Sequence, residues 1–409
     1  MSDTQSIEQL FAELVSFFDD SERDQAMERL HQVMKGPIDD AEVICELLRA
    51  EKSQSFFEDR HQKQTGHNKQ RFNFQVADQA CKILAAAYPT QRFESERTLF
   101  PINADAEREV SQTLSQDGVC VLPQKLDLAV CDRIIESLSD LSFRVKATGD
   151  RVNGYRSDTI DTIRGNTSWI VDQQDVLNIP EVQQFASDPT ILNLVQDYLG
   201  CVPIHDQANC WWTINHRTDQ RSMKSDAQLY HQDKDFVRFV KVFVYLNDVD
   251  ERNGPHSFIR GSARDYEQYA PEGYRMMQRV EDGYLEGQYE SDRFLTIQGD
   301  KGTVVLEDTS GFHKGTPVVE GHRLMLQLEY CCSLYFNPGL SFTLEGLTEE
   351  YREFAQRNPR MFMMYDHDRY LVRRKKLAAN DRFNARKVKA SIRQMGRYLE
   401  SMVGLRKSA

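Results

Sequence analysis

Hydrophobic residues change their spacing twice along this chain, and the change divides the sequence into three parts. Up to about residue 95 they recur at helical spacing, first in Leu10, Leu14, Phe17 and Phe18 and last in Val76, Ala80, Leu84 and Ala87. Strand patterns dominate from Val202 to Tyr335, and helical spacing returns from Leu347 onward. We therefore expect a helical N-terminal extension (1–95), a core domain (105–345) and a C-terminal helical segment (346–409).

The core domain contains many short apolar stretches separated by turn residues. The candidate strands read ANCWWTIN, RFVKVFVYLNDV, SFIRGS, RFLTI, GTVVLED and RLMLQLEYCCSLYF, with Gly254-Pro255, Gly299-Asp300 and Gly321 between them. Flanking helices are predicted at about 105–116, 128–141 and 188–200. This order predicts a mainly β fold of the jelly-roll, cupin-like kind with flanking helices.

Composition narrows the range of partners. The 409 residues carry a net charge of −12, which argues against general nucleic-acid binding because phosphate contacts need a basic surface. The segment from Asp366 to the end is an exception, with 13 Lys/Arg against 4 Asp/Glu. This basic segment either meets an acidic partner or a phosphate-bearing ligand, or packs on the acidic body. The N-terminal helices are expected to pack on the body or to mediate homo-oligomerisation.

Features of the sequence predict a cytoplasmic location. The N-terminus MSDTQSIEQL lacks the cationic segment of a secretory signal. No apolar run approaches the ~20 residues that a membrane-spanning helix needs. The eight cysteines have no CxxC pairing or regular spacing, which is typical of reduced, buried thiols.

Two sequence segments carry candidate chemistry. In QLYHQDKDFVRF, His231 and Asp233 are two positions apart, so that on a strand both side chains would project to one face. His313 lies 80 positions after Asp233 between two predicted strands, and Arg323 follows ten positions later. Two histidines and a carboxylate form a facial ligand set for a divalent metal that leaves three positions open. A barrel-facing arginine suits bidentate binding of a small dicarboxylate.

The order of these motifs resembles that of the Fe(II)/2-oxoglutarate-dependent oxygenases, specifically the phytanoyl-CoA dioxygenase-like family. The similar segments include DGVCVLP, DPTILNLVQDYLG and AQLYHQDKDFVRFVKVFVYLNDVDERNGPHSFIRGSAR, and the likeness covers about 110–335. One departure is Ala263, where the family usually has a histidine that is not a metal ligand.

The resemblance implies a double-stranded β-helix with Fe(II) bound by His231, Asp233 and His313 and with 2-oxoglutarate bound by Arg323. Phe243 would line the pocket of this cosubstrate, and Thr213 and Gln228 would hydrogen-bond to it; for these three, simple strand packing or surface exposure remains an equal alternative. The implied reaction consumes O2, releases succinate and CO2, and hydroxylates the substrate. Desaturation and ring closure stay open, whereas halogenation is disfavoured because Asp233 is present.

The substrate is expected to be a small molecule, such as a natural product, an amino acid or an acyl compound. An anionic substrate is favoured if cations line the pocket mouth, and the candidate cations are Arg151, Arg156, Lys224, Arg238 and Arg260. For any single one of them, an ordinary solvated charge is the preferred explanation. The polar segment 156–169 is expected to cover the site, by analogy with the family.

Other readings stay open. His216, His256 and His322 lack the spacing of the triad and are expected at the surface or in a supporting layer. A cupin-like metalloprotein would have no need of Arg323 as a carboxylate anchor. A non-catalytic barrel used in binding or sensing would have no need of an intact triad.

Overall fold

The computed structural model describes residues 73–94, 98–146, 168–214, 228–275, 277–335 and 342–365, with parts of 44–51 and the backbone of 151–153. The helices predicted around Leu10 and Phe17, the covering segment up to residue 167 and the basic segment from Asp366 lie outside these residues. The division into an extension, a core domain and a C-terminal segment therefore stays a prediction.

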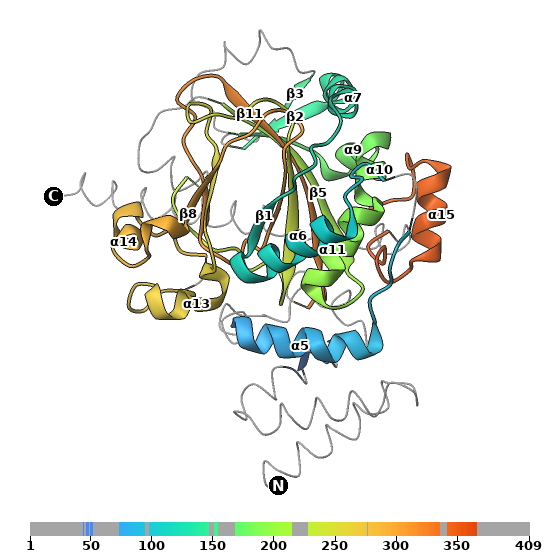
Figure 1. The fold of residues 1–409 in the computed structure, drawn as a ribbon. Coiled ribbons are helices and arrows are strands. Elements are labelled where there is room, and N and C mark those ends of the chain that lie inside the picture. Colours follow the sequence, from blue (N-terminus) through green and yellow to red (C-terminus); the bar gives the residue numbers. More distant parts are fainter. Residues whose placement is uncertain are drawn as a thin grey trace, which may run out of the picture.

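Two antiparallel sheets form the core (Figure 1). The long sheet has the order β1 (Val119–Val121), β9 (Val304–Glu307), β6 (Phe239–Tyr245), β11 (His322–Cys331), β5 (Ile204–Ile214), β4 (Ser168–Val171), β2 (Ser142–Val145) and β3 (Arg151–Asn153). The short sheet has the order β10 (His313–Gly315), β7 (His256–Ile259) and β8 (Phe294–Ile297). After β6 the chain passes to the short sheet, returns for β9, crosses again for β10 and returns for β11. This path confirms the predicted jelly roll.

Strand β6 is buried along its whole length because both faces of the long sheet are covered. Val240, Val242 and Val244 belong to the largest apolar cluster, which lies on the helical side. Phe243 and Tyr245 point to the opposite side and belong to a second cluster. The alternation of side chains thus separates a helix-covered face from a face that looks toward the short sheet.

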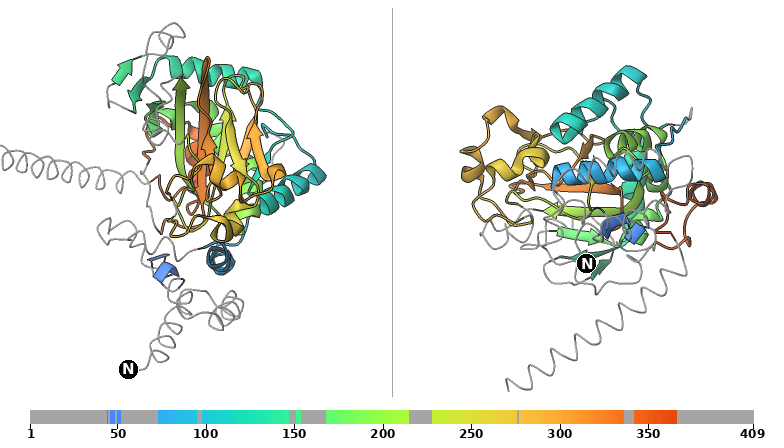
Figure 2. Two further views of the ribbon diagram at one scale, coloured as in Figure 1. Left: turned by 90° about the vertical axis from the view of Figure 1, so that its left-hand side faces the viewer. Right: turned by 90° about the horizontal axis from the view of Figure 1, so that it is seen from below.

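Helices surround the sheets, as the two further views also show (Figure 2). They are α5 (Phe74–Ala87), α6 (Ala104–Asp117), α7 (Leu128–Ser139), α9 (Gln173–Leu177), α10 (Pro180–Ala186), α11 (Pro189–Leu199), α13 (Ser262–Tyr269), α14 (Asp282–Glu286) and α15 (Glu349–Arg357), with the 3₁₀ turn η2 (Ser291–Arg293). The helices predicted at 105–116, 128–141 and 188–200 are confirmed as α6, α7 and α11. Gly200 ends α11 in the left-handed conformation at φ 76°.

Helix α5 lies across one end of the barrel (Figure 1). Its residues Val76, Ala80 and Leu84 are buried in the same cluster as the strands of the long sheet. Arg238, which directly precedes β6, donates to Asp78 at 2.9 Å and lies over the ring of Phe74. This part of the N-terminal extension therefore packs on the body, as expected. No helix in the described part of the chain is both long and apolar enough to cross a bilayer.

Candidate active site

His231 and His313, 82 residues apart in the sequence, meet between the two sheets. They form an isolated antiparallel bridge in which each backbone amide donates to the other carbonyl, at 3.0 and 2.9 Å. The amide of Asp233 donates to the carbonyl of Thr309 at 2.7 Å. The strand expected through His231 and Asp233 is therefore a single bridge at His231. The chain does not continue as a strand, because Asp233 bonds to the loop that precedes His313. A regular strand starts only at Phe239.

The two imidazoles are fixed so that the same nitrogen of each is available. Nδ1 of His231 lies 3.0 Å from the carbonyl oxygen of Leu229, and Nδ1 of His313 lies 3.0 Å from that of Gly311. A carbonyl oxygen only accepts, so Nδ1 carries the proton in each ring. Nε2 is then left with a lone pair, which is the arrangement that backbone carbonyls impose on metal-binding histidines.

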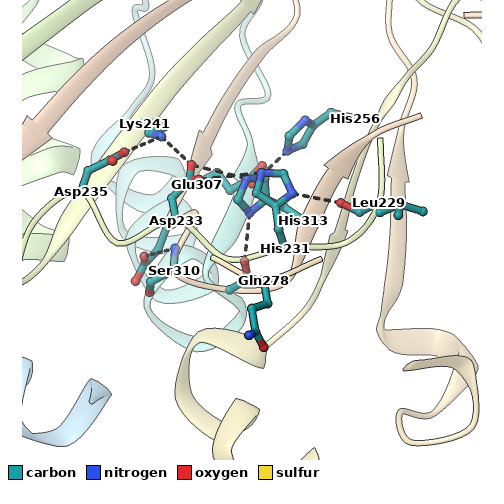
Figure 3. Close-up of polar contacts among 12 residues, drawn as sticks. Leu229, His231, Asp233, Asp235, Lys241, His256, Gln278, Glu307, Ser310 and His313 are labelled. Carbon is teal, nitrogen blue, oxygen red and sulfur yellow. Dashed lines mark hydrogen bonds and ion pairs between the residues drawn. The ribbon is translucent and has the colours of Figure 1, made fainter. Parts of the chain in front are cut away.

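The carboxylate of Asp233 completes a compact set of ligand atoms (Figure 3). Its Oδ1 lies 3.7 Å from Nε2 of His231, and its Oδ2 lies 3.5 Å from Nε2 of His313. One ligand atom from each of the three residues lies within 4.8 Å of the others. Two imidazoles and one carboxylate at these separations fit a first-row divalent metal such as Fe(II).

Burial and charge set the protonation of the set. Burial, together with the nearby His313, lowers the pKa of His231 to about 2, so this ring is neutral. Burial opposes charge on His313 as well, but the carboxylate of Asp233 raises its pKa. The pKa of Asp233 lies well below its usual value because Lys241 and His313 outweigh the effect of burial. Asp233 is therefore an anion ready to bind a cation.

A cavity of about 330 Å³ adjoins the triad. Its walls come from β4, β5, β6 and β11 of the long sheet and from β7 and β10 of the short sheet. Of the residues named from the sequence, Thr213, Phe243 and Arg323 line it, whereas Gln228 is buried outside the lining. Such a concave space between sheets suits a small molecule.

Arg323 is a buried cation at the wall of this cavity. Its side chain is 5% exposed, and Nη1 donates to the carbonyl of Gly254. No carboxylate among the described residues forms an ion pair with it, and its Nε has no hydrogen-bond partner there. Burial lowers the pKa of Arg323, and among the described residues only the phenol of Tyr245 acts in the opposite direction. A buried charge of this kind needs an anion, which the cavity has room to supply.

Gly315 makes room for this guanidinium. A Cβ at Gly315 would lie 2.8 Å from Nη2 of Arg323, closer than such atoms approach. Gly315 pairs with His256 of β7, so the short sheet passes directly over the guanidinium of Arg323.

Lys241 and Glu307, both near the triad, were missed from the sequence, whereas His256 was expected at the surface or in a supporting layer. Lys241 lines the cavity and donates to Asp233 at 2.7 Å. Nε2 of His256 lies 2.9 Å from Oε1 of Glu307, and its ring stacks on that of His313 at a centroid distance of 5.7 Å. Burial raises the pKa of Glu307 to about 8 and lowers that of His256, so this pair is uncharged at neutral pH. His256 thus supports the triad and is not part of it.

Two of the cations considered for the pocket mouth do not line the cavity. Arg238 is turned toward α5, and Arg260 lies near Asp117, so neither lines the cavity. Side chains of the other three candidates, Arg151, Arg156 and Lys224, lie outside the described residues. Lys146 and Arg279 line the cavity in their place.

A family model described as phytanoyl-CoA dioxygenase (PhyH) matches residues 114–323, just over half of the 409 residues. The chain belongs to the phytanoyl-CoA dioxygenase family. The match includes the triad and Arg323, and it supports the resemblance seen in the sequence. No curated protein matches this sequence.

Solved structures with a similar fold include an epimerase and an iron-bound protein. The non-haem α-ketoglutarate-dependent epimerase SnoN from nogalamycin biosynthesis is 15% identical, with 56% of this chain and 83% of that chain covered and a TM-score of 0.38. EctD from S. alaskensis with bound Fe is 16% identical, with 59% and 80% covered and a TM-score of 0.36. These likenesses are distant, so the activity of this chain rests on its own residues and its family.

Family membership and the His-Asp-His set together support a non-haem iron, 2-oxoglutarate-dependent oxygenase. Its cofactors are Fe(II), 2-oxoglutarate and O2, and the donor atoms fit the metal, while Arg323 fits the cosubstrate.

We predict that His231→Ala binds a divalent metal at least about tenfold more weakly than the unchanged protein, because one of three ligands is lost. Titration of the metal-free protein with Co(II), followed by visible absorption, measures this. His322→Ala is the matched control, since His322 packs on Trp212 at 4.8 Å between ring centroids and does not line the cavity. Equal affinity of His231→Ala and His322→Ala would remove His231 from the metal site.

Proposed function

We propose that this protein hydroxylates a C–H bond of a small anionic molecule, with Fe(II) bound by His231, Asp233 and His313 and with 2-oxoglutarate anchored by Arg323. One observation carries the proposal. A buried guanidinium without a carboxylate partner among the described residues lines the same cavity as a compact His-Asp-His set. The distal carboxylate of 2-oxoglutarate would supply the missing anion.

The iron, when bound, would couple the oxidative decarboxylation of 2-oxoglutarate to succinate and CO2 with the insertion of one oxygen atom into the substrate. Arg323 would hold the distal carboxylate through its remaining N–H donors. Thr213 stands opposite Arg323 in the register of β5 and β11, where its hydroxyl could hydrogen-bond to the same ligand. Phe243 would form an apolar wall of the cavity, whose lining does not include Gln228.

The charges of the cavity support an anionic substrate. Asp233 is the single acidic residue of the described lining, whereas Lys146, Lys241, Arg279 and Arg323 also line it. Lys241 pairs with acidic side chains, and Arg323 is assigned to the cosubstrate. Arg279 lies close enough to Asp233 for their charges to interact, so it stands near the metal position. The excess of cationic over acidic side chains in the described lining would attract the anionic group of the substrate.

Replacing Arg323 by Met should raise the Kd of 2-oxoglutarate roughly 30-fold or more, because a buried charge pair is lost. Metal binding should be unchanged. Calorimetry on the metal-loaded, oxygen-free protein measures both. A ligand control is 2-oxobutyrate, which keeps the keto acid but lacks the distal carboxylate, and its affinity should not fall in Arg323→Met. Unchanged affinity for 2-oxoglutarate would show that Arg323 is not the anchor.

Substrate charge can be tested with pairs consisting of a carboxylic acid and its methyl ester. We expect stimulators of succinate release to be acids, with KM for the ester about tenfold higher, as the loss of a charge-assisted hydrogen bond implies. Arg279→Gln should reduce this preference, whereas Arg275→Gln, at an exposed position outside the lining, should retain it. Esters that serve as well as acids would contradict an anionic substrate.

A further inference from the structure

Lys241 is a buried lysine in the middle of the long sheet. It lies on the cavity-facing side of β6 and is 6% exposed. The strand register places it between Glu307 of β9 and Glu329 of β11, both fully buried. A row of ionisable side chains therefore crosses the inner face of the sheet, two residues along β6 from Phe243, and burial raises the pKa of both glutamates.

Carboxylates surround the ammonium of Lys241. Nζ lies 2.7 Å from Oδ2 of Asp233 and 3.0 Å from Oδ2 of Asp235 (Figure 3). It also lies 3.5 Å from Oε2 of Glu329. Burial opposes the charge, but these anions raise the pKa of Lys241 well above its usual value. Nζ donates hydrogen bonds to Asp233 and Asp235, and Oε2 of Glu329 lies near the ammonium without accepting one. Lys241 is therefore not the residue that binds the anion of a substrate.

The contact with Asp233 bears on how that carboxylate can bind a metal. A carboxylate can offer a metal one oxygen or both. The ammonium of Lys241 competes for the lone pairs of Oδ2, whereas Oδ1 has no contact with it. If both oxygens bound, Asp233 would fill two coordination positions and the triad four, which leaves two. A keto acid that chelates through two oxygens would then leave no position for O2.

We propose that Lys241 is a positioning residue that restricts Asp233 to coordination through one oxygen and so keeps a third position of the metal open. This inference rests on the proposed metal-binding role of the triad. It assigns Lys241 a role in the geometry of the metal site, in addition to its role in neutralising buried acids.

A purely structural role makes a different prediction. If Lys241 only neutralises Glu329 and Asp235, its loss leaves buried anions unpaired. Removal of one anion should then restore both the stability of the protein and the geometry of the metal site. If Lys241 positions Asp233, removal of the charge on Glu329 restores stability but leaves the metal geometry altered. The double variant Lys241→Met/Glu329→Gln separates these roles, and it also provides a protein for study if Lys241→Met alone fails to fold.

The test uses the metal-free full-length chain and Mn(II) alone, without 2-oxoglutarate or substrate. Water-proton relaxation reports the number of water molecules on the bound ion. We expect about three waters for the unchanged protein and for Lys241→Arg, and about two for Lys241→Met and for the double variant, because a facial triad leaves three positions open. Thermal unfolding of each variant, measured in parallel, should show the double variant more stable than Lys241→Met.

The outcomes separate the two proposals. If the unchanged protein binds no Mn(II), the assignment of the triad fails, and with it the proposed function. Three waters in Lys241→Met would overturn the role of Lys241 while leaving the triad intact. Three waters in the double variant, with two in Lys241→Met, would also overturn it, because Lys241 would then act only by neutralising Glu329.

Discussion

The pair of backbone hydrogen bonds between His231 and His313 is the constraint on which the site depends. It joins the segment before β6 to the start of β10, and so it ties the long sheet to the short sheet at one point. Both rings project from this bridge, with their Nδ1 atoms held by backbone carbonyls two residues earlier. The donor nitrogens are thus oriented by the main chain before any metal arrives, which reduces the entropy lost on binding.

Around this bridge, the inner face of the long sheet carries two buried cations in different surroundings. Toward one end, Lys241 lies among the acidic side chains of Asp233, Asp235 and Glu329, so that this cation has its partners within the protein. Toward the other end, Arg323 has a backbone carbonyl but no acidic partner among the described residues. The contacts of Lys241 orient the metal-binding carboxylate of Asp233. The charge of Arg323 is available to bind an anionic small molecule. Phe243 lies between them and separates the two environments.

Much of this site could be predicted from the sequence because its residues follow local rules. The alternation along β11 places Arg323 in the cavity and His322 on the opposite side, against Trp212. The same rule would have shown that Arg238 shares the helical side with Val240, and so excluded it as one of the candidate cations at the pocket mouth. Contacts of Lys241 with Glu329 and of His256 with Glu307 depend on strand register and sheet-to-sheet packing. Neither is encoded in the spacing of nearby residues.

The most direct test of the account is an anaerobic titration of the metal-free protein with Fe(II) and then 2-oxoglutarate, followed by visible absorption. The account predicts a weak charge-transfer band that appears only when both are present, because the keto acid must chelate an iron that has open positions. If both components bind and no band appears, the keto acid does not reach the metal, and the shared cavity of the triad and Arg323 does not form an oxygenase site.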